Sequence, residues 1–215
     1  FYPEGGGQVG DRGTLTSDNG EAYQVLDTKK ENNLIVHVLD RVPSGASFQA
    51  QVNTALRTSS ARNHSATHLL HEALREVLGT HVEQKGSLVK PDGLRFDFSH
   101  FQKVNEDELA QIAALVQRRI LANLSCQEHR NMAIADAQAA GAMMLFGEKY
   151  GDTVRMIEFG SSKELCGGIH VPATGAIGPF RIESEGAVAA GIRRIEALTG
   201  DAAMEAQRNE REQLV

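Results

Sequence analysis

The sequence predicts the α+β fold class, with a small N-terminal β-barrel-like module followed by a two-layer α/β domain. Residues 1–55 alternate short strand-like segments with turn clusters, whereas residues 56–200 mix helix-period segments with further strands. The chain has 215 residues, of which 41% are hydrophobic, so it can bury a sizeable core. Residues 201–215 are polar and helix-prone, which indicates the start of a C-terminal linker or coiled-coil helix.

The N-terminal module is expected to form a small barrel or meander. Its strands are predicted at residues 13–16, 22–28, 33–39 and 47–53. Clusters rich in Gly, Asn, Asp, Ser and Pro separate these strands, and such clusters are typical of tight turns. Short strands joined by tight turns predict antiparallel neighbours.

Two long helices are predicted in the second domain. The first covers residues 56–79, where apolar residues recur at helical spacing before Gly79 ends the pattern. The second covers residues 106–122, with Asn105 as its N-cap. The other expected elements are a short helix near 133–140 and strands near 81–89, 93–99, 154–159, 178–185 and 191–197.

Charge and composition exclude several classes of protein. The net charge of −6 argues against a generic electrostatic nucleic-acid binder, although it leaves room for an RNA held by a local basic patch or by other domains. No transmembrane run or signal peptide is evident, and Cys126 and Cys166 suggest no disulfide framework, so a cytoplasmic protein without membrane association is expected. Phe1 opens the chain inside a motif, which indicates a fragment of a longer protein.

The most informative pattern combines two histidines at helical spacing with a distant cysteine–histidine pair. His64 and His68 are four residues apart and so share one helix face, and Cys166 and His170 can converge from a loop. Three imidazoles and one thiolate suit tetrahedral Zn²⁺ better than Mg²⁺ or Ca²⁺, which prefer oxygen ligands. Copper and iron remain open on ligand type alone.

The number of ligands bears on the role of this metal. Four protein ligands usually make a structural zinc site, because a catalytic site keeps one position open. Cys166 is the natural candidate for a loosely bound ligand if the site is catalytic. His71 follows on the same helix, and we expect it to pack nearby or to support a ligand.

Three polar segments are further candidates. Successive glycines in Gly5-Gly6-Gly7-Gln8 let backbone N–H groups approach a phosphate or sugar, although the run also suits a flexible turn and no P-loop follows. Gln84-Lys85-Gly86-Ser87 offers an amide, an ammonium and a hydroxyl, or is simply a polar strand end. Arg193 and Arg194 point to opposite faces of a strand, so only one can face a site.

Five separated blocks, in this order, resemble the editing region of bacterial alanyl-tRNA synthetases. The blocks are FYPEGGGQVGD, RNHSATHLLHEALREVLGTHVEQKGSLV, LRFDFSH, ELCGGIHV and AAGIRRIEALTG. The histidine and cysteine pairs also resemble threonyl-tRNA synthetase editing domains and free-standing AlaX proteins. The resemblance implies a zinc-containing editing domain over residues 56–200 that hydrolyses mischarged Ser-tRNA(Ala) and Gly-tRNA(Ala). Its implied partners are the tRNA acceptor end and the aminoacylation and C-terminal domains of a parent chain.

The resemblance also implies roles for individual residues. The implied zinc ligands are His64, His68, Cys166 and His170. The positions implied in editing and amino-acid discrimination are Thr67, Gln84, Ser87 and Cys166. The tRNA-binding residues are expected to be Gly5, Gly6, Gly7, Gln8, Lys85 and Arg194. One departure is Ile169, where alanyl enzymes often have threonine, and it leaves the ligand set intact.

Other functions are also open at this point. The chain could be a zinc-stabilised module that binds tRNA without catalysis, or a free-standing AlaX-type trans-editing protein. A metallopeptidase is disfavoured because Ser65, and not a glutamate base, follows His64. For an editing reaction we expect Gln84 and backbone N–H groups to hold the attacking water or the oxyanion, while the general base stays unassigned.

Overall fold

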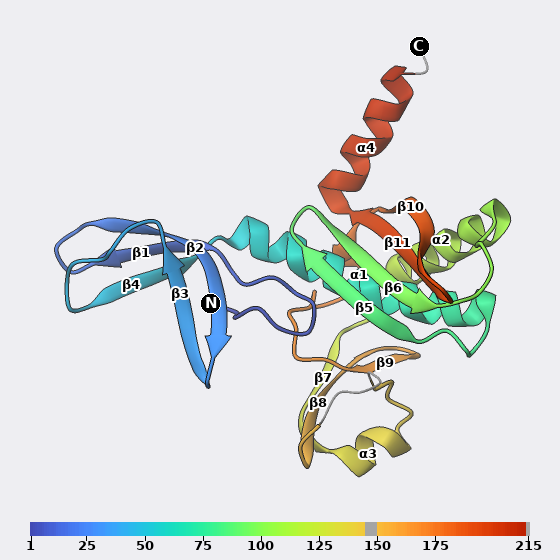
Figure 1. The fold of residues 1–215 in the computed structure, drawn as a ribbon, viewed down its shortest axis with the longest axis horizontal. Coiled ribbons are helices and arrows are strands. Elements are labelled where there is room, and N and C mark those ends of the chain that lie inside the picture. Colours follow the sequence, from blue (N-terminus) through green and yellow to red (C-terminus); the bar gives the residue numbers. More distant parts are fainter. Residues whose placement is uncertain (145–149, 214–215) are drawn as a thin grey trace.

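The computed structural model describes residues 1–144 and 150–213. Within these residues the chain forms three antiparallel sheets and four α-helices, which confirms the mixed α+β class. The last two residues of the predicted C-terminal segment, 214 and 215, lie outside the described residues. Figure 1 shows an N-terminal sheet at one end of helix α1 (Thr54–Leu78) and the rest of the molecule around its other end.

The N-terminal sheet is open, so the prediction of a barrel-like module is wrong. Its strands pair in the order β3-β2-β1-β4, and their bounds are β1 (Gly13–Ser17), β2 (Ala22–Glu31), β3 (Leu34–Leu39) and β4 (Phe48–Val52). The first part of β2 pairs with β1 and the remainder pairs with β3, with a register shift between Val25 and Asp27. The two hairpins therefore splay apart along β2, and β3 and β4 do not meet among the described residues (Figure 1).

The central sheet carries the main core. Its order is β10-β11-β6-β5, with β5 (Gln84–Lys90), β6 (Gly93–Ser99), β10 (Phe180–Ala189) and β11 (Ile192–Thr199). Helices α1 and α2 (Glu106–Leu121) pack against each other and against this sheet. The core consists of apolar side chains such as Leu69 and Leu70 of α1, Phe96 and Phe98 of β6, and Ile112 of α2. Burial of these side chains from both layers drives the association.

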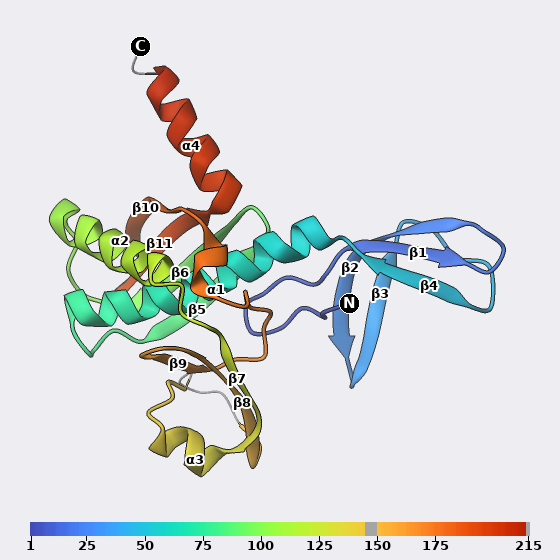
Figure 2. The same ribbon diagram turned by 180° about the vertical axis from the view of Figure 1, so that it is seen from behind.

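A third, smaller sheet lies below the central one in Figures 1 and 2 and contains elements that the sequence did not predict. Its order is β7-β8-β9, with β7 (Gln127–Ala133), β8 (Thr153–Phe159) and β9 (Ser162–Leu165), and helix α3 (Ile134–Ala139) packs on it. Strand β7 escaped prediction because QEHRNMA is polar and mostly exposed, and β9 because it has only four residues.

The C-terminal helix α4 (Gly200–Gln213) projects away from the body of the molecule, as Figures 1 and 2 show from opposite sides. Only its first turn is buried, at Gly200 and Ala203. Among the described residues, no helix has both the length and the apolar character needed to cross a bilayer.

Candidate metal centre and adjoining cavity

Helix α1 delivers two histidines to the middle of the molecule. The helix begins at the N-cap Asn53, whose side chain accepts a hydrogen bond from Leu56 N, and it is buried over most of Ser60–Leu74. His64 and His68 are only 4% and 3% exposed, and their four-residue spacing places both rings on the same side of the helix.

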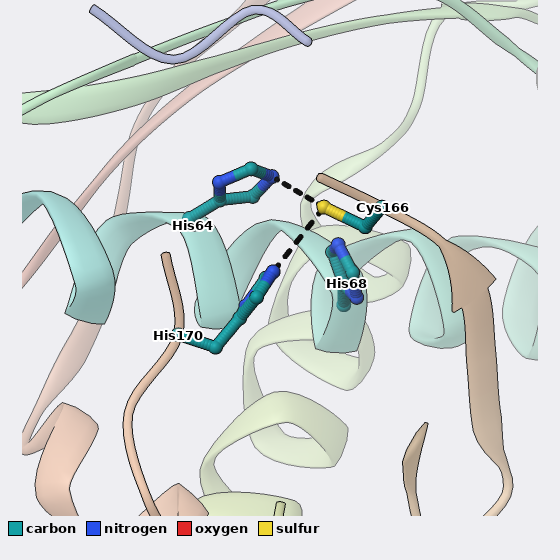
Figure 3. A group of neighbouring side chains, drawn as sticks. All are labelled: His64, His68, Cys166 and His170. Carbon is teal, nitrogen blue, oxygen red and sulfur yellow. Dashed lines mark hydrogen bonds between the residues drawn. The ribbon is translucent and has the colours of Figure 1, made fainter. Parts of the chain in front are cut away.

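The loop that follows β9 supplies the other two side chains. The Sγ atom of Cys166 lies 3.3 Å from His64 Nε2 and 3.2 Å from His170 Nε2 (Figure 3). One potential ligand atom from each of His64, His68, Cys166 and His170 lies within 4.8 Å of the others. The two predicted pairs therefore meet, and the cluster could hold a metal ion.

The outer nitrogens of two rings are held by other side chains. His64 Nδ1 lies 2.7 Å from Gln8 Oε1, and His170 Nδ1 lies 3.1 Å from Ser65 Oγ. Both rings therefore turn Nε2 toward Cys166. Metal-binding histidines typically show this pattern, with one nitrogen for the metal and the other hydrogen-bonded to a neighbour.

In His68, too, one ring nitrogen faces a protein side chain and the other is left for a metal. Its Nε2 lies 3.6 Å from Glu164 Oε2, whereas its buried Nδ1 has no hydrogen-bond partner among the described residues. His71 Nδ1 lies 3.0 Å from the second oxygen of the same carboxylate. A buried nitrogen without a partner is costly, and coordination to a metal would relieve that cost.

The electrostatics of the site favour neutral imidazoles. Burial, followed by the nearby His68 and Arg155, lowers the pKa of His64 well below its ordinary value. Burial and the neighbouring histidines likewise lower the pKa of His170 well below that value. A neutral imidazole has the lone pair that a metal requires, so the described residues fit a metal ion.

Two features outside the ligand set hold the loop in place. Arg155 Nη1 donates to the carbonyl oxygens of Cys166 at 2.8 Å and Gly168 at 2.7 Å, and Arg155 Nε donates to Glu128 Oε1 at 2.5 Å. A Cβ atom on Gly168 would overlap the His64 ring, whereas one on Gly167 would have no neighbour within 4 Å in the part of the chain that the structure describes. The loop can therefore approach His64 only with glycine at position 168.

A cavity of about 280 Å³ opens beside the cluster. Its lining residues come from α1, β5, the third sheet and the glycine-rich segment, and they include Gly6, Thr67, Gln84, Ser87, Tyr150, Thr153, Arg155, Glu164, His64, His68 and Cys166. The volume lies at the small end of ligand pockets, so the cavity suits a small group better than a whole nucleotide.

A β-bulge brings two of these lining residues to the same face. Gln84 lies opposite Phe98, but Gly86 lies opposite Asp97, so Lys85 is an extra residue in β5. Without the bulge, Gln84 and Ser87 would point to opposite faces of the strand. With it, both lie on the side of β6 that buries its phenylalanines, and Gln84 Nε2 donates to Ser87 Oγ at 3.2 Å.

Comparisons with known proteins place the chain among aminoacyl-tRNA synthetases. Residues 154–196 match the family described as "Threonyl and Alanyl tRNA synthetase second additional domain". The alanine--tRNA ligase of Flavobacterium psychrophilum is 64% identical over 212 residues, covering 94% of this chain and 24% of the relative. That of Parabacteroides distasonis is 60% identical over 205 residues, covering 94% and 23% respectively.

The chain belongs to the alanyl-tRNA synthetase family. It spans about a quarter of the length of these relatives, 24% in one case and 23% in the other. The segment matched by the family runs from β8 to β11 and includes Cys166 and His170 but neither histidine of α1.

The residues of the glycine-rich segment that were predicted to bind tRNA differ in their surroundings. Gly6 lines the cavity, and Gly7, at φ +81°, packs so closely on Ser87 that it has no room for a Cβ atom. The Gln8 side chain is 1% exposed. The Gln8 side chain therefore points into the protein. A contact between tRNA and the backbone of this segment stays a prediction.

The two predicted cations lie outside the cavity lining. Lys85 Nζ lies 2.9 Å from Glu83 Oε2, and Arg194 donates two hydrogen bonds to Asp97, at 2.6 and 2.8 Å. Each positive charge therefore already has a carboxylate partner, and any role in binding tRNA stays a prediction.

Sequence reasoning missed the residues that support the ligands. Gln8, Ser65 and Arg155 hold ring nitrogens or loop carbonyls, but no spacing rule connects them with positions 64 and 166–170. Only the glycine-rich context singled out Gln8, and it suggested a different partner.

Proposed function

We propose that the chain is the editing region of an alanyl-tRNA synthetase, and that it hydrolyses the ester bond of Ser-tRNA(Ala) and Gly-tRNA(Ala). One observation carries the proposal. A single small cavity collects the implied discrimination residues Thr67, Gln84 and Ser87 beside the cluster of three imidazoles and one thiol. A cavity of this size accepts the aminoacyl end of a tRNA and leaves the rest of the acceptor outside.

Zinc is the proposed metal. The ligands would be His64, His68, Cys166 and His170, because nitrogen and sulfur donors select zinc over magnesium and calcium. When bound, zinc would join the two ligand pairs, and it would supply Lewis-acid chemistry to the aminoacyl group only by expanding its coordination beyond these four residues.

Thr67 is the proposed selector of serine. Its hydroxyl donates to the backbone oxygen of Asn63 at 2.8 Å, so the oxygen that remains toward the cavity can only accept a hydrogen bond. A seryl hydroxyl can donate that bond, whereas an alanyl methyl group leaves the buried oxygen unpaired. Sites that hydrogen-bond a substrate hydroxyl discriminate more strongly than apolar pockets, so Ala-tRNA would be spared.

Gln84 is the proposed holder of the attacking water or of the developing oxyanion. One N–H of its amide is used by Ser87, which fixes the side chain, and no hydrogen bond within the described residues uses the other N–H or the carbonyl oxygen, so both could serve a reacting group. A donor fixed in advance of the reaction stabilises charge that appears only in the transition state.

The proposed partners follow from the same assignment. The acceptor end of tRNA(Ala) would enter the cavity, and the aminoacylation and C-terminal domains would lie in the part of the parent chain that this chain does not cover. The reaction would accompany protein synthesis in the cytoplasm.

Deacylation of Ser-tRNA(Ala) by the wild-type chain and by Cys166→Ala and Gln84→Ala tests this function. Loss of one oxyanion donor typically costs about 10²-fold in rate, and we expect Gln84→Ala to lose that much while it still binds zinc. The exposed Gln49 of β4 provides the control Gln49→Ala, which should keep the wild-type rate.

Two results would overturn the proposal. If Cys166→Ala and Gln84→Ala both keep full activity with zinc bound, the assigned roles are wrong. If the wild-type chain binds tRNA(Ala) and zinc but does not hydrolyse the ester, the closed set of four ligands is structural and the chain is a tRNA-binding module.

A further inference from the structure

The glycine-rich segment is docked against β5 through its backbone. Val89 N donates to Gly7 O at 2.8 Å, and Val9 N donates to Val89 O at 3.1 Å, so residues on either side of Gln8 bond to the same strand residue. The left-handed conformation of Gly7 and its close approach to Ser87 allow this docking. The segment therefore has a fixed position, and it directs the Gln8 side chain inward.

The Gln8 amide oxygen touches both segments that carry the ligands. Oε1 lies 2.7 Å from His64 Nδ1 on α1, and it accepts a hydrogen bond from Ile169 N at 3.0 Å in the loop. An amide oxygen can only accept, so His64 must carry its proton on Nδ1. Its Nε2 then presents a lone pair toward Cys166 Sγ, 3.3 Å away.

The NH₂ group of the Gln8 side chain argues against a role in stability alone. Its Nε2 is buried and has no hydrogen-bond partner among the described residues. Burying an unsatisfied donor costs about 1–3 kcal/mol, so a side chain selected for stability alone would not carry one. The accepting oxygen is the useful half of this side chain.

We propose that Gln8 is a positioning residue of the metal centre, which selects the tautomer of His64 and joins the 166–170 loop to α1. The inference rests on the proposed zinc centre and is independent of the proposed hydrolysis. Through Gln8, docking of the N-terminal segment on β5 is coupled to the affinity of the site for its metal.

Zinc affinity, measured by competition with a chromophoric chelator, tests the role of the oxygen. Gln8→Met keeps the length of the side chain but removes the acceptor, and loss of such a supporting contact typically costs about 10–100-fold in metal affinity. Gln8→Glu keeps an accepting oxygen and removes the unsatisfied donor, so it should bind zinc within about tenfold of wild type. The control Gln49→Met changes an exposed glutamine and should bind as wild type does.

Nitrogen NMR of the His64 ring in the wild-type chain tests the tautomer without any change at Gln8. We expect a proton on Nδ1 in both the metal-free and the zinc-loaded chain. This measurement decides the question even if Gln8→Met fails to fold.

Each outcome separates this inference from the function proposed above. Tight zinc binding by Gln8→Met, or a proton on His64 Nε2 in place of Nδ1, would overturn the role of Gln8 and leave the zinc centre standing. A wild-type chain that binds no zinc would overturn both. Zinc binding that depends on Gln8, in a chain that does not deacylate Ser-tRNA(Ala), would support the role of Gln8 and overturn the hydrolysis alone.

Discussion

The two halves of the candidate metal centre are built in different ways. His64 and His68 lie on a long buried helix, where the backbone hydrogen-bond ladder alone brings both rings to one side. Cys166 and His170 lie on irregular backbone between β9 and the short 3₁₀ helix Thr174–Ile177. Such a segment has no ladder of its own, and its carbonyl groups bond instead to distant side chains.

The contrast indicates where the centre is vulnerable. The backbone of the helix half is held mainly by its own hydrogen-bond ladder, whereas the backbone of the loop half is held by the side chains of Gln8, Ser65 and Arg155, which lie in three other segments of the chain. Substitutions that leave all four ligands untouched should therefore damage the loop half.

Gly168→Ala should have the largest effect, because the new methyl group would overlap the His64 ring. Overpacking of this kind costs about 1–3 kcal/mol, and here it also separates the two ligand pairs, so zinc affinity should fall as well. Gly167→Ala is the matched control, since a methyl group there meets no atom of the described residues within 4 Å. Urea unfolding and zinc titration of both variants measure the effects, and equal behaviour of the pair would contradict the account.

Arg155→Met should come next, because it removes two charged hydrogen bonds to loop carbonyls. A hydrogen bond to a charged group contributes about 1.5–3 kcal/mol, but Arg155 is 28% exposed and water can hydrate the freed carbonyls. The combined loss should therefore stay below that of Gly168→Ala, which also separates the ligand pairs. Arg130 also pairs with Glu128 but is 75% exposed, so Arg130→Met should destabilise the fold much less than Arg155→Met does. Urea unfolding of the two zinc-free variants provides the comparison, and an equal loss would show that the loop does not depend on Arg155.

Ser65→Ala should have a moderate effect. The fully buried hydroxyl lies 3.1 Å from His170 Nδ1 and accepts a hydrogen bond from Val171 N at 3.1 Å. Leaving these groups unpaired should cost about 1–3 kcal/mol, less a few tenths gained from the helix propensity of alanine. Ser59→Ala on the same helix reports the propensity gain, and a Ser65→Ala variant as stable as Ser59→Ala would rule out this support for His170.

Glu128→Gln should have the smallest effect, and it should depend on pH. Hydrogen bonds from Arg130 and Arg155 lower the pKa of Glu128 to about 2. Because the folded-state pKa lies below that of the unfolded chain, the carboxylate stabilises the fold above about pH 4.5 and loses this effect as the pH falls toward 2. The stability difference between wild type and Glu128→Gln should therefore shrink from pH 6 to pH 3. A difference that grows over this range would contradict the assignment.

The sequence was sufficient wherever the structure depends on local periodicity. Helix α2 was expected at 106–122 and covers Glu106–Leu121, with the expected cap at Asn105 extended to a capping box with Glu108. The four candidate ligands were found because helical spacing and a short cysteine–histidine interval are local patterns. The roles of Thr67, Gln84 and Ser87 and the domain boundaries at residues 55 and 200 stay predictions.

The features that escaped prediction depend on tertiary contacts. The bulge at Lys85 exists only in the pairing of β5 with β6, yet it decides that Gln84 and Ser87 share a face. The N-terminal sheet stays open because the first part of β2 pairs with β1 and the rest pairs with β3. The burial of Gln8 requires the docking of its segment on Val89, which no pattern within GGGQ encodes.

X-ray absorption at the zinc edge of the purified chain can decide whether His64, His68, Cys166 and His170 bind zinc together, because it reports both the number and the type of ligands. We expect one zinc ion per chain, with one sulfur at about 2.3 Å and three nitrogens at about 2.0–2.1 Å. The sulfur contribution should disappear in Cys166→Ala. A chain that binds no zinc, or a zinc ion surrounded by oxygen without sulfur, would contradict the account.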